Sequence, residues 1–157
     1  MKTGVFAGSF CPVTVGHVDA IERASKLCDK LYVVVGVNGA KKYAIPDEMR
    51  LETVRLATSH ISNVEVVLHQ GMMTDFCKSV GATVMVKSIR NSTDLQEVIN
   101  LTDANRDYWD GETVFVLGDS KFRHVSSSLV RELCSLKQDV SKYVPANCLP
   151  IVERFLK

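Results

Sequence analysis

The sequence lacks the features that mark several specialised classes of protein. Its five cysteines form no CxxC pair and lie far apart, at Cys11, Cys28, Cys77, Cys134 and Cys148. An odd and scattered set argues against a disulfide framework or a zinc site and predicts reduced thiols that are mostly buried. No apolar run is long enough to cross a membrane, and the first residues enter a strand-like run rather than a leader peptide. We therefore expect a soluble cytoplasmic protein without membrane contact.

An excess of charge of one sign is also lacking. The 157 residues include 19 Lys and Arg against 18 Asp and Glu, for a net charge of +1. This balance offers no broad positive field for nucleic acid or for an anionic membrane. The length suffices to bury a full core, and no linker, repeat or low-complexity tract divides it. We expect a single domain over residues 1–157.

Short apolar runs alternate with helical periodicity along the chain. The predicted strands are residues 3–7, 31–37, 64–68, 82–86 and 113–117. The predicted helices are residues 17–28, 47–60, 73–80, 94–108, 126–135 and 146–156. This order predicts an α/β fold with one doubly wound, five-stranded parallel sheet, Rossmann-like, and a helical C-terminus. The first strand is not followed by G-x-G-x-x-G, which disfavours a Rossmann dehydrogenase.

The most informative segment is the loop from Gly8 to His17, GSFCPVTVGH, between the first predicted strand and the first predicted helix. A loop that runs from a strand into a helix N-terminus forms an anion site, because the first N–H groups lack partners and the helix dipole is positive there. We expect His17 at the first helical position, where it would contact a phosphate.

Other cationic and hydroxyl side chains follow three further predicted strands. They are Lys41 and Lys42, Lys87 and Arg90, and the segment from Lys121 to Ser128. Doubly wound sheets bind ligands in a crevice beyond the carboxyl ends of their strands, where all these segments would meet. A neutral protein that gathers cations at this edge is equipped to bind a polyphosphate.

Four motifs give the chain a resemblance to a known family. Residues 14–17 read T-V-G-H, a lysine pair follows at 41–42, residues 87–90 read K-S-I-R, and residues 125–132 read V-S-S-S-L-V-R-E. On these motifs the chain resembles the bacterial phosphopantetheine adenylyltransferases, of the nucleotidyltransferase superfamily with a T-x-G-H or H-x-G-H signature. The resemblance implies a nucleotidyltransferase fold and transfer of the adenylyl group of ATP to 4′-phosphopantetheine, in coenzyme A synthesis. It also implies Mg²⁺ as cofactor and a homo-oligomer, commonly a hexamer.

The resemblance further implies a role for individual residues. Catalysis would rest on His17, Lys41 and Arg90, with His17 as a neutral donor to the α-phosphate. The acceptor would contact Ser9, Lys41, Met73 and Lys87, and no residue is implied as a metal ligand. The implied ATP-binding residues are Ser9, Phe10, His17, Ser88, Ile89, Arg90, Glu97, Val98, Phe122, Arg123, His124, Val125, Ser126, Ser127 and Ser128.

The chain departs from the family pattern at several positions. Cys11 stands where the family has Asp, which predicts a looser loop because a thiol bonds the backbone poorly. Lys87 replaces an Arg and gives up its bidentate fork, which predicts weaker acceptor binding. Val98 aligns with an acidic residue near the ribose, and the acidic Glu97 precedes it. Phe122 and His124 replace the usual aromatic residues beside the adenine.

Two alternatives remain open at this point. One keeps the chemistry but changes the acceptor to another phosphate monoester, such as nicotinate mononucleotide or glycerol phosphate; Thr14 in place of His argues against it. The other is a nucleotide-binding regulatory module that has lost catalysis. The departures from the family pattern at Cys11, Lys87 and Val98 favour it.

Overall fold

A parallel sheet of five strands, in the order β3-β2-β1-β4-β5, forms the centre of the computed structural model, which describes residues 1–157. The strands are β1 Thr3–Gly8, β2 Lys30–Val37, β3 Val64–Gln70, β4 Val84–Ile89 and β5 Glu112–Leu117. The chain starts in the middle strand, winds outward through β2 and β3, and returns to the other side of β1 through β4 and β5. This doubly wound parallel sheet confirms the predicted fold class.

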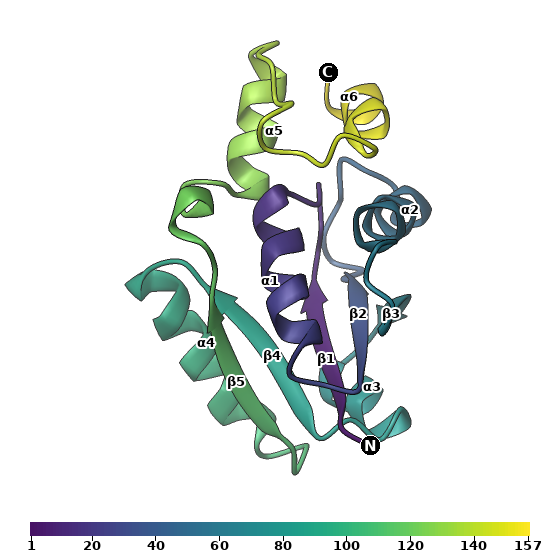
Figure 1. Cartoon of the computed structure of the whole chain (residues 1–157), viewed down its shortest axis with the longest axis vertical. Helices are drawn as coiled ribbons and strands as arrows, with labels where there is room; N and C mark the ends of the chain where they lie inside the picture. Colours follow the sequence, from purple (N-terminus) through teal and green to yellow (C-terminus); the bar gives the residue numbers. More distant parts are fainter.

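Helices cover both faces of the sheet. They are α1 Val15–Ser25, α2 Asp47–Thr58, α3 Met73–Ser79, α4 Ser92–Asn105, α5 Ser127–Ser135 and α6 Leu149–Leu156. A short 3₁₀ turn, η1, covers Ser120–Phe122. Helices α5 and α6 lie beyond the carboxyl ends of the strands, above α1 and α2 in the view of Figure 1. They therefore stand next to the loops from which a ligand site can be built.

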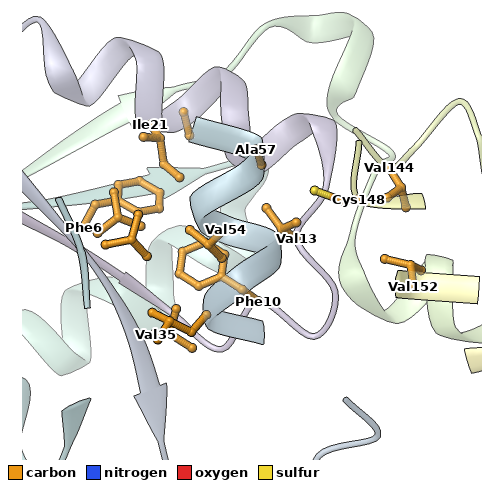
Figure 2. Close-up of a cluster of buried hydrophobic side chains, with 14 of the residues drawn as sticks. Phe6, Phe10, Val13, Ile21, Val35, Val54, Ala57, Val144, Cys148 and Val152 are labelled. Atoms are coloured by element: carbon orange, nitrogen blue, oxygen red, sulfur yellow. The ribbon is translucent and has the colours of Figure 1, made fainter. Parts of the chain in front are cut away.

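The core consists of two clusters, one on each face. A cluster of 20 buried residues packs between the sheet and helices α1, α2, α5 and α6, and part of it is drawn in Figure 2. A smaller cluster of 6 includes Cys77 of α3 and Trp109, which follows α4. In β2, Val33 and Val35 belong to the first cluster and Val34 to the second. Successive strand residues point to opposite faces, so a run of valines in a strand buried on both sides supplies both clusters.

Most element boundaries differ from the predictions by one to three residues, and the differences at α1, β4 and the final helix matter for the site and its surroundings. Helix α1 begins at Val15 because Thr14 caps it, which makes His17 the third helical residue rather than the first. Strand β4 was predicted over residues 82–86 but runs from Val84 to Ile89, because its last residues pair with β5. The final helix begins at Leu149, three residues later than predicted.

The cysteines and the helices can be compared with what the composition predicted. All five cysteines are free, and four of them are buried, as predicted for small apolar side chains. No helix combines the length and the apolar character that crossing a membrane requires.

Candidate active site

A cavity of about 330 Å³ lies where the carboxyl ends of β1, β4 and β5 meet the N-terminus of α5. We call it the central cavity. It occupies the point at which the sheet winding reverses, between β1 and β4, where doubly wound sheets bind their ligands. It is lined by 12 residues of the predicted ATP-binding set, namely His17, Ser88, Ile89, Arg90, Glu97, Val98, Phe122, Arg123, Val125, Ser126, Ser127 and Ser128. Most of that predicted set is therefore brought together in one place.

The first wall of the cavity is the N-terminus of α1. The Thr14 hydroxyl accepts a hydrogen bond from the His17 backbone N–H at 3.3 Å, and the Thr14 backbone N–H donates to His17 Nδ1 at 3.0 Å. This is a capping box with histidine in the place that glutamate or glutamine usually takes. The cap both starts the helix and fixes the imidazole ring.

These contacts determine which ring nitrogen of His17 carries the proton. Because Nδ1 accepts from a backbone N–H, the neutral ring carries its proton on Nε2. Burial and the nearby positive charge of Arg90 lower the pKa of His17 to about 4. At neutral pH the ring is therefore uncharged and has one N–H free to donate.

Arg90, directly after β4, forms a second wall of the cavity, near enough to His17 for its charge to act on the imidazole. Its Nε donates to the Asp94 carboxylate at 3.1 Å, and its Nη1 donates to the Val125 carbonyl at 3.1 Å. The first contact joins it to α4 and the second to the loop before α5. Arg90 is thus fixed as a cation at the edge of the cavity, with donors left over.

The N-terminus of α5 is the third wall. The Ser126 hydroxyl caps the helix by accepting from the Leu129 N–H at 3.1 Å. Ser127 Oγ donates to the Pro12 carbonyl at 2.7 Å, which fastens this helix to the loop after β1. The first N–H groups of the helix have no intrahelical partner and face a site that favours anions.

A second hydrogen bond holds the loop after β1 at Cys11, the position at which the family that the sequence resembles has Asp. Arg131 Nη1 donates to the Cys11 carbonyl at 2.7 Å, while the Cys11 side chain itself is buried. The loop is therefore anchored through its carbonyls, a contact that does not depend on the side chain at position 11.

Three members of the predicted ATP-binding set lie outside the cavity lining. Phe10 is 1% exposed and belongs to the core. Its ring packs edge-on against the His17 ring, with 5.0 Å between the ring centroids. Phe10 therefore supports the histidine rather than facing a ligand. His124 is exposed and packs edge-on against Tyr143, and Ser9 is exposed in the loop after β1.

The residues predicted to bind the acceptor, Ser9, Lys41, Met73 and Lys87, form a separate set that we call the outer set. None of them lines the central cavity. They lie after β1, after β2, at the start of α3 and near the end of β4, so they come from the same edge of the sheet.

Lys87 differs most from its predicted setting. It lies within β4, paired with Phe115 of β5, and not in the loop that follows. Its neighbour Ser88 lines the central cavity, so by strand alternation Lys87 points to the opposite face, where α3 packs. Burial lowers the pKa of the Lys87 ammonium below its usual value.

Acidic residues that sequence reasoning missed also line the cavity. The Asp19 carboxylate accepts from the Asp119 N–H at 2.9 Å and from Arg23 at 3.1 Å. Burial alone raises the pKa of Asp19, but these bonds outweigh burial and hold the pKa below its usual range. Asp119 stands two residues after a predicted strand, and this position indicated an acidic residue at the same edge of the sheet.

Of the predicted residues, Glu97 and Val98 both line the cavity, so an acidic side chain is present on that wall.

These carboxylates do not form a metal cage. No group of three or more His, Cys, Asp or Glu side chains is arranged to hold a metal ion. Asp19 and Asp94 are already engaged by arginines, at 3.1 Å each. The residues therefore do not fit a dedicated magnesium site; Mg²⁺ commonly binds through substrate phosphates and water instead.

Comparisons with known proteins agree with this geometry. A model of the cytidylyltransferase-like family matches residues 5–133. A phosphopantetheine adenylyltransferase of Rhodopirellula baltica is 43% identical over 150 residues, covering 93% of this chain and 84% of the relative. One of Streptococcus gordonii is 41% identical over 155 residues, covering 98% and 94%. The chain belongs to the phosphopantetheine adenylyltransferase family.

A solved structure adds a likeness of fold to this family membership. A candidate nicotinate-nucleotide adenylyltransferase from Vibrio parahaemolyticus superposes with a TM-score of 0.73, over 99% of this chain and 98% of that one. The two sequences are 15% identical, so the likeness concerns the fold alone. It confirms the nucleotidyltransferase-like architecture expected for the family.

Proposed function

We propose that this enzyme transfers the adenylyl group of ATP to 4′-phosphopantetheine, which yields dephospho-coenzyme A and pyrophosphate. The observation that carries the chemistry is His17, whose Nε2–H is free to donate in the same cavity as Arg90 and the N-terminus of α5. The identity of the acceptor rests on the relatives, which bear this activity in their names over nearly the whole chain.

The proposed reaction is an in-line displacement at phosphorus. An oxygen of the acceptor phosphate attacks the α-phosphorus of ATP, and the bond from that phosphorus to the bridging oxygen of the β-phosphate breaks. A phosphate monoester is largely dianionic at neutral pH, because its second pKa is about 6. No general base is needed, so the protein contributes positioning and stabilisation of charge.

The walls of the central cavity divide this work between them. His17 would donate from Nε2 to the α-phosphate, and the interaction would strengthen as negative charge grows in the transition state. The N–H groups and hydroxyls of Ser127 and Ser128 would hold the β- and γ-phosphates, together with Arg90. Glu97 would accept from the ribose. These assignments are supported by the lining of the cavity.

The outer set would hold the acceptor. Ser9 and Lys41 would bind its phosphate from the loops after β1 and β2, and Lys87 would approach from β4. Met73, which packs against the smaller core cluster, would contact the pantetheine arm. The central cavity and the outer set border the same sheet edge, so the two phosphates would meet near His17.

Magnesium would enter as a companion of the ATP phosphates and neutralise part of their charge. We also propose a cytoplasmic location, because five free thiols suit a reducing compartment.

A homo-oligomer, a hexamer by family resemblance, is supported by the edge of the sheet at β5. Phe115 and Leu117 lie on the same face of this edge strand and are 39% and 53% exposed. Ile99 and Leu101 of α4 are 38% and 49% exposed. Uncovered apolar groups beside an edge strand mark a surface for protein contact. Light scattering of the purified protein measures the assembly; a monomer would contradict the proposal.

Pyrophosphate release from ATP and Mg²⁺ tests the proposed function. Parallel reactions would contain 4′-phosphopantetheine, nicotinate mononucleotide or glycerol phosphate. Of these three acceptors, we expect only 4′-phosphopantetheine to give turnover with ATP. Turnover with another acceptor would change the substrate. No turnover, with ATP binding intact by calorimetry, would favour a regulatory module.

A further inference from the structure

Arg50, in the first turn of α2, is the largest of the fully buried side chains, with 0% of its surface exposed. A buried charge is costly unless it is paired and hydrogen-bonded. Its only carboxylate partner is Asp47, which is itself 43% exposed, and its Nε has no partner in the protein. Arg50 does not line the central cavity and has no place in the reaction described so far. Its other contacts indicate what it does.

The guanidinium joins the ends of two strands. Nη1 donates to the Ser9 carbonyl at 2.6 Å and to the Gly36 carbonyl at 3.1 Å. Ser9 follows β1, and Gly36 is the penultimate residue of β2. One nitrogen therefore fixes the start of the loop after β1 against the end of the neighbouring strand.

The flat side of the same guanidinium holds a third segment. It lies over the Tyr43 ring, with 3.8 Å from Cζ to the ring centroid. The Tyr43 hydroxyl accepts from the Asn38 N–H at 3.3 Å. The Asn38 carbonyl in turn accepts from the Lys41 N–H at 2.9 Å. A continuous set of contacts thus runs from Arg50 to the turn that carries Lys41.

The backbone beside Ser9 needs such support. Phe10 has φ of 50°, in the left-handed region that bulky residues rarely occupy. Such a conformation persists only where the surroundings determine it. The ring of Phe10 lies in the core, and the carbonyl that precedes it is held by Arg50.

We propose that Arg50 is a positioning residue that sets Ser9 and Lys41 at the spacing required by the acceptor phosphate. The inference rests on the proposed function, because it concerns the phosphate that Ser9 and Lys41 would bind. Arg50 acts from beneath the site, through backbone groups, and does not touch the substrate. Its planar fork bonds and stacks at once, which a lysine ammonium does not do.

The test is Arg50→Lys, with Arg55→Lys as matched control on the exposed side of the same helix. Steady-state pyrophosphate release gives KM for both substrates. We expect Arg50→Lys to raise KM for 4′-phosphopantetheine roughly tenfold, the effect of one lost charge-assisted hydrogen bond, and to leave KM for ATP within about twofold. Arg55→Lys should change neither.

A merely structural role predicts a different result. If both KM values rose together, or neither changed, the proposal would be wrong. If Arg50→Lys does not fold, Tyr43→Leu decides, because it removes the stacked ring and the hydroxyl that accepts from Asn38 while it leaves Arg50 in place. We expect it to raise KM for the acceptor roughly threefold, as for a weak contact. An unchanged KM would overturn the proposal.

Amide hydrogen exchange separates this proposal from the proposed function. In Arg50→Lys, exchange should accelerate in residues 9–11 and 38–42 and stay unchanged at the N-terminus of α5. If wild-type protein shows no turnover but exchange follows this pattern, the proposed function is wrong and the positioning of Ser9 and Lys41 by Arg50 holds. Turnover of the wild type without this pattern would overturn the positioning role alone.

Discussion

The central cavity and the outer set are built in different ways, although they share one edge of the sheet. In the cavity, the functional side chains are themselves hydrogen-bonded to the protein: His17 to Thr14, Arg90 to Asp94 and the Val125 carbonyl. In the outer set, Lys41 is exposed, and the turn that carries it is held through its backbone. The cavity fixes its charged side chains, whereas the turn that carries Lys41 is fixed only through its backbone.

This difference between the two regions matches the different demands of the nucleotide and the acceptor. Fixed donors suit a site where charge develops, because they need no reorganisation at the moment of reaction. An exposed lysine such as Lys41 on a fixed backbone suits a phosphate that must enter and leave, because a lysine acts as a flexible point charge. Changes in the cavity should therefore alter kcat or nucleotide binding, and changes in the outer set should alter acceptor KM.

Removing His17 should have the largest effect. His17→Ala deletes the Nε2–H donor to the α-phosphate, and we expect kcat to fall about 10²–10³-fold, as for one lost transition-state donor. Acceptor KM should change little. Steady-state kinetics measures both.

His60→Ala provides the matched control, because His60 pairs with Glu22 on the surface, at 2.7 Å. It should retain wild-type kcat. A large rise in acceptor KM in His17→Ala would break the division between the two regions.

Stability at acid pH should show how firmly the cavity fixes His17. Its pKa is about 4 in the folded chain, below the usual histidine value of 6.5 that applies to the unfolded chain. Between these values the unfolded chain binds more protons, so stability falls as pH drops from 6.5 to 4. The loss amounts to at most about 3 kcal/mol.

Urea unfolding at pH 7 and pH 4 measures this loss. In His17→Gln the part that is due to His17 should disappear, so the variant should lose less stability than the wild type over the same range. An equal loss in both proteins would show that His17 is not held neutral by folding.

Arg90→Gln should have a moderate effect. The variant loses the cation at the cavity wall, and we expect ATP to bind roughly tenfold more weakly by calorimetry. The pKa of His17 should rise, because Arg90 lowers it, and should stay below 6.5, because burial is the larger cause. Arg106→Gln, at the far end of α4, is the control for a lost surface arginine.

Much of the fold and the central cavity could be predicted from the sequence, because both depend on local patterns. The apolar run over 31–37 became β2, and the loop before His17 became an anion-favouring helix N-terminus. The cap that fixes the histidine ring was missed, since histidine is not the residue expected in a capping box.

The remaining differences arise from contacts between distant segments. Arg50 reads as an ordinary polar position in α2, yet its partners Ser9 and Gly36 are 41 and 14 residues away. Lys87 was placed in a loop because a lysine interrupts the apolar run. Only the pairing with Phe115 on β5 extends the strand through it. Such pairings are set by the whole sheet, which periodicity in one segment does not describe.

The position of Lys87 gives the prediction with the smallest effect. Lys87→Arg would offer a planar fork in place of a point charge on the face away from the central cavity. If Lys87 binds the acceptor phosphate, the second charge-assisted bond should lower KM for 4′-phosphopantetheine roughly twofold to fivefold and leave KM for ATP unchanged. Lys78→Arg, on the exposed side of α3, is the matched control. An unchanged acceptor KM would mean that Lys87, half-hidden against α3, supports the sheet and does not reach the phosphate. The phosphate would then be held by the loop residues Ser9 and Lys41 without Lys87, and the contrast with the cavity would increase.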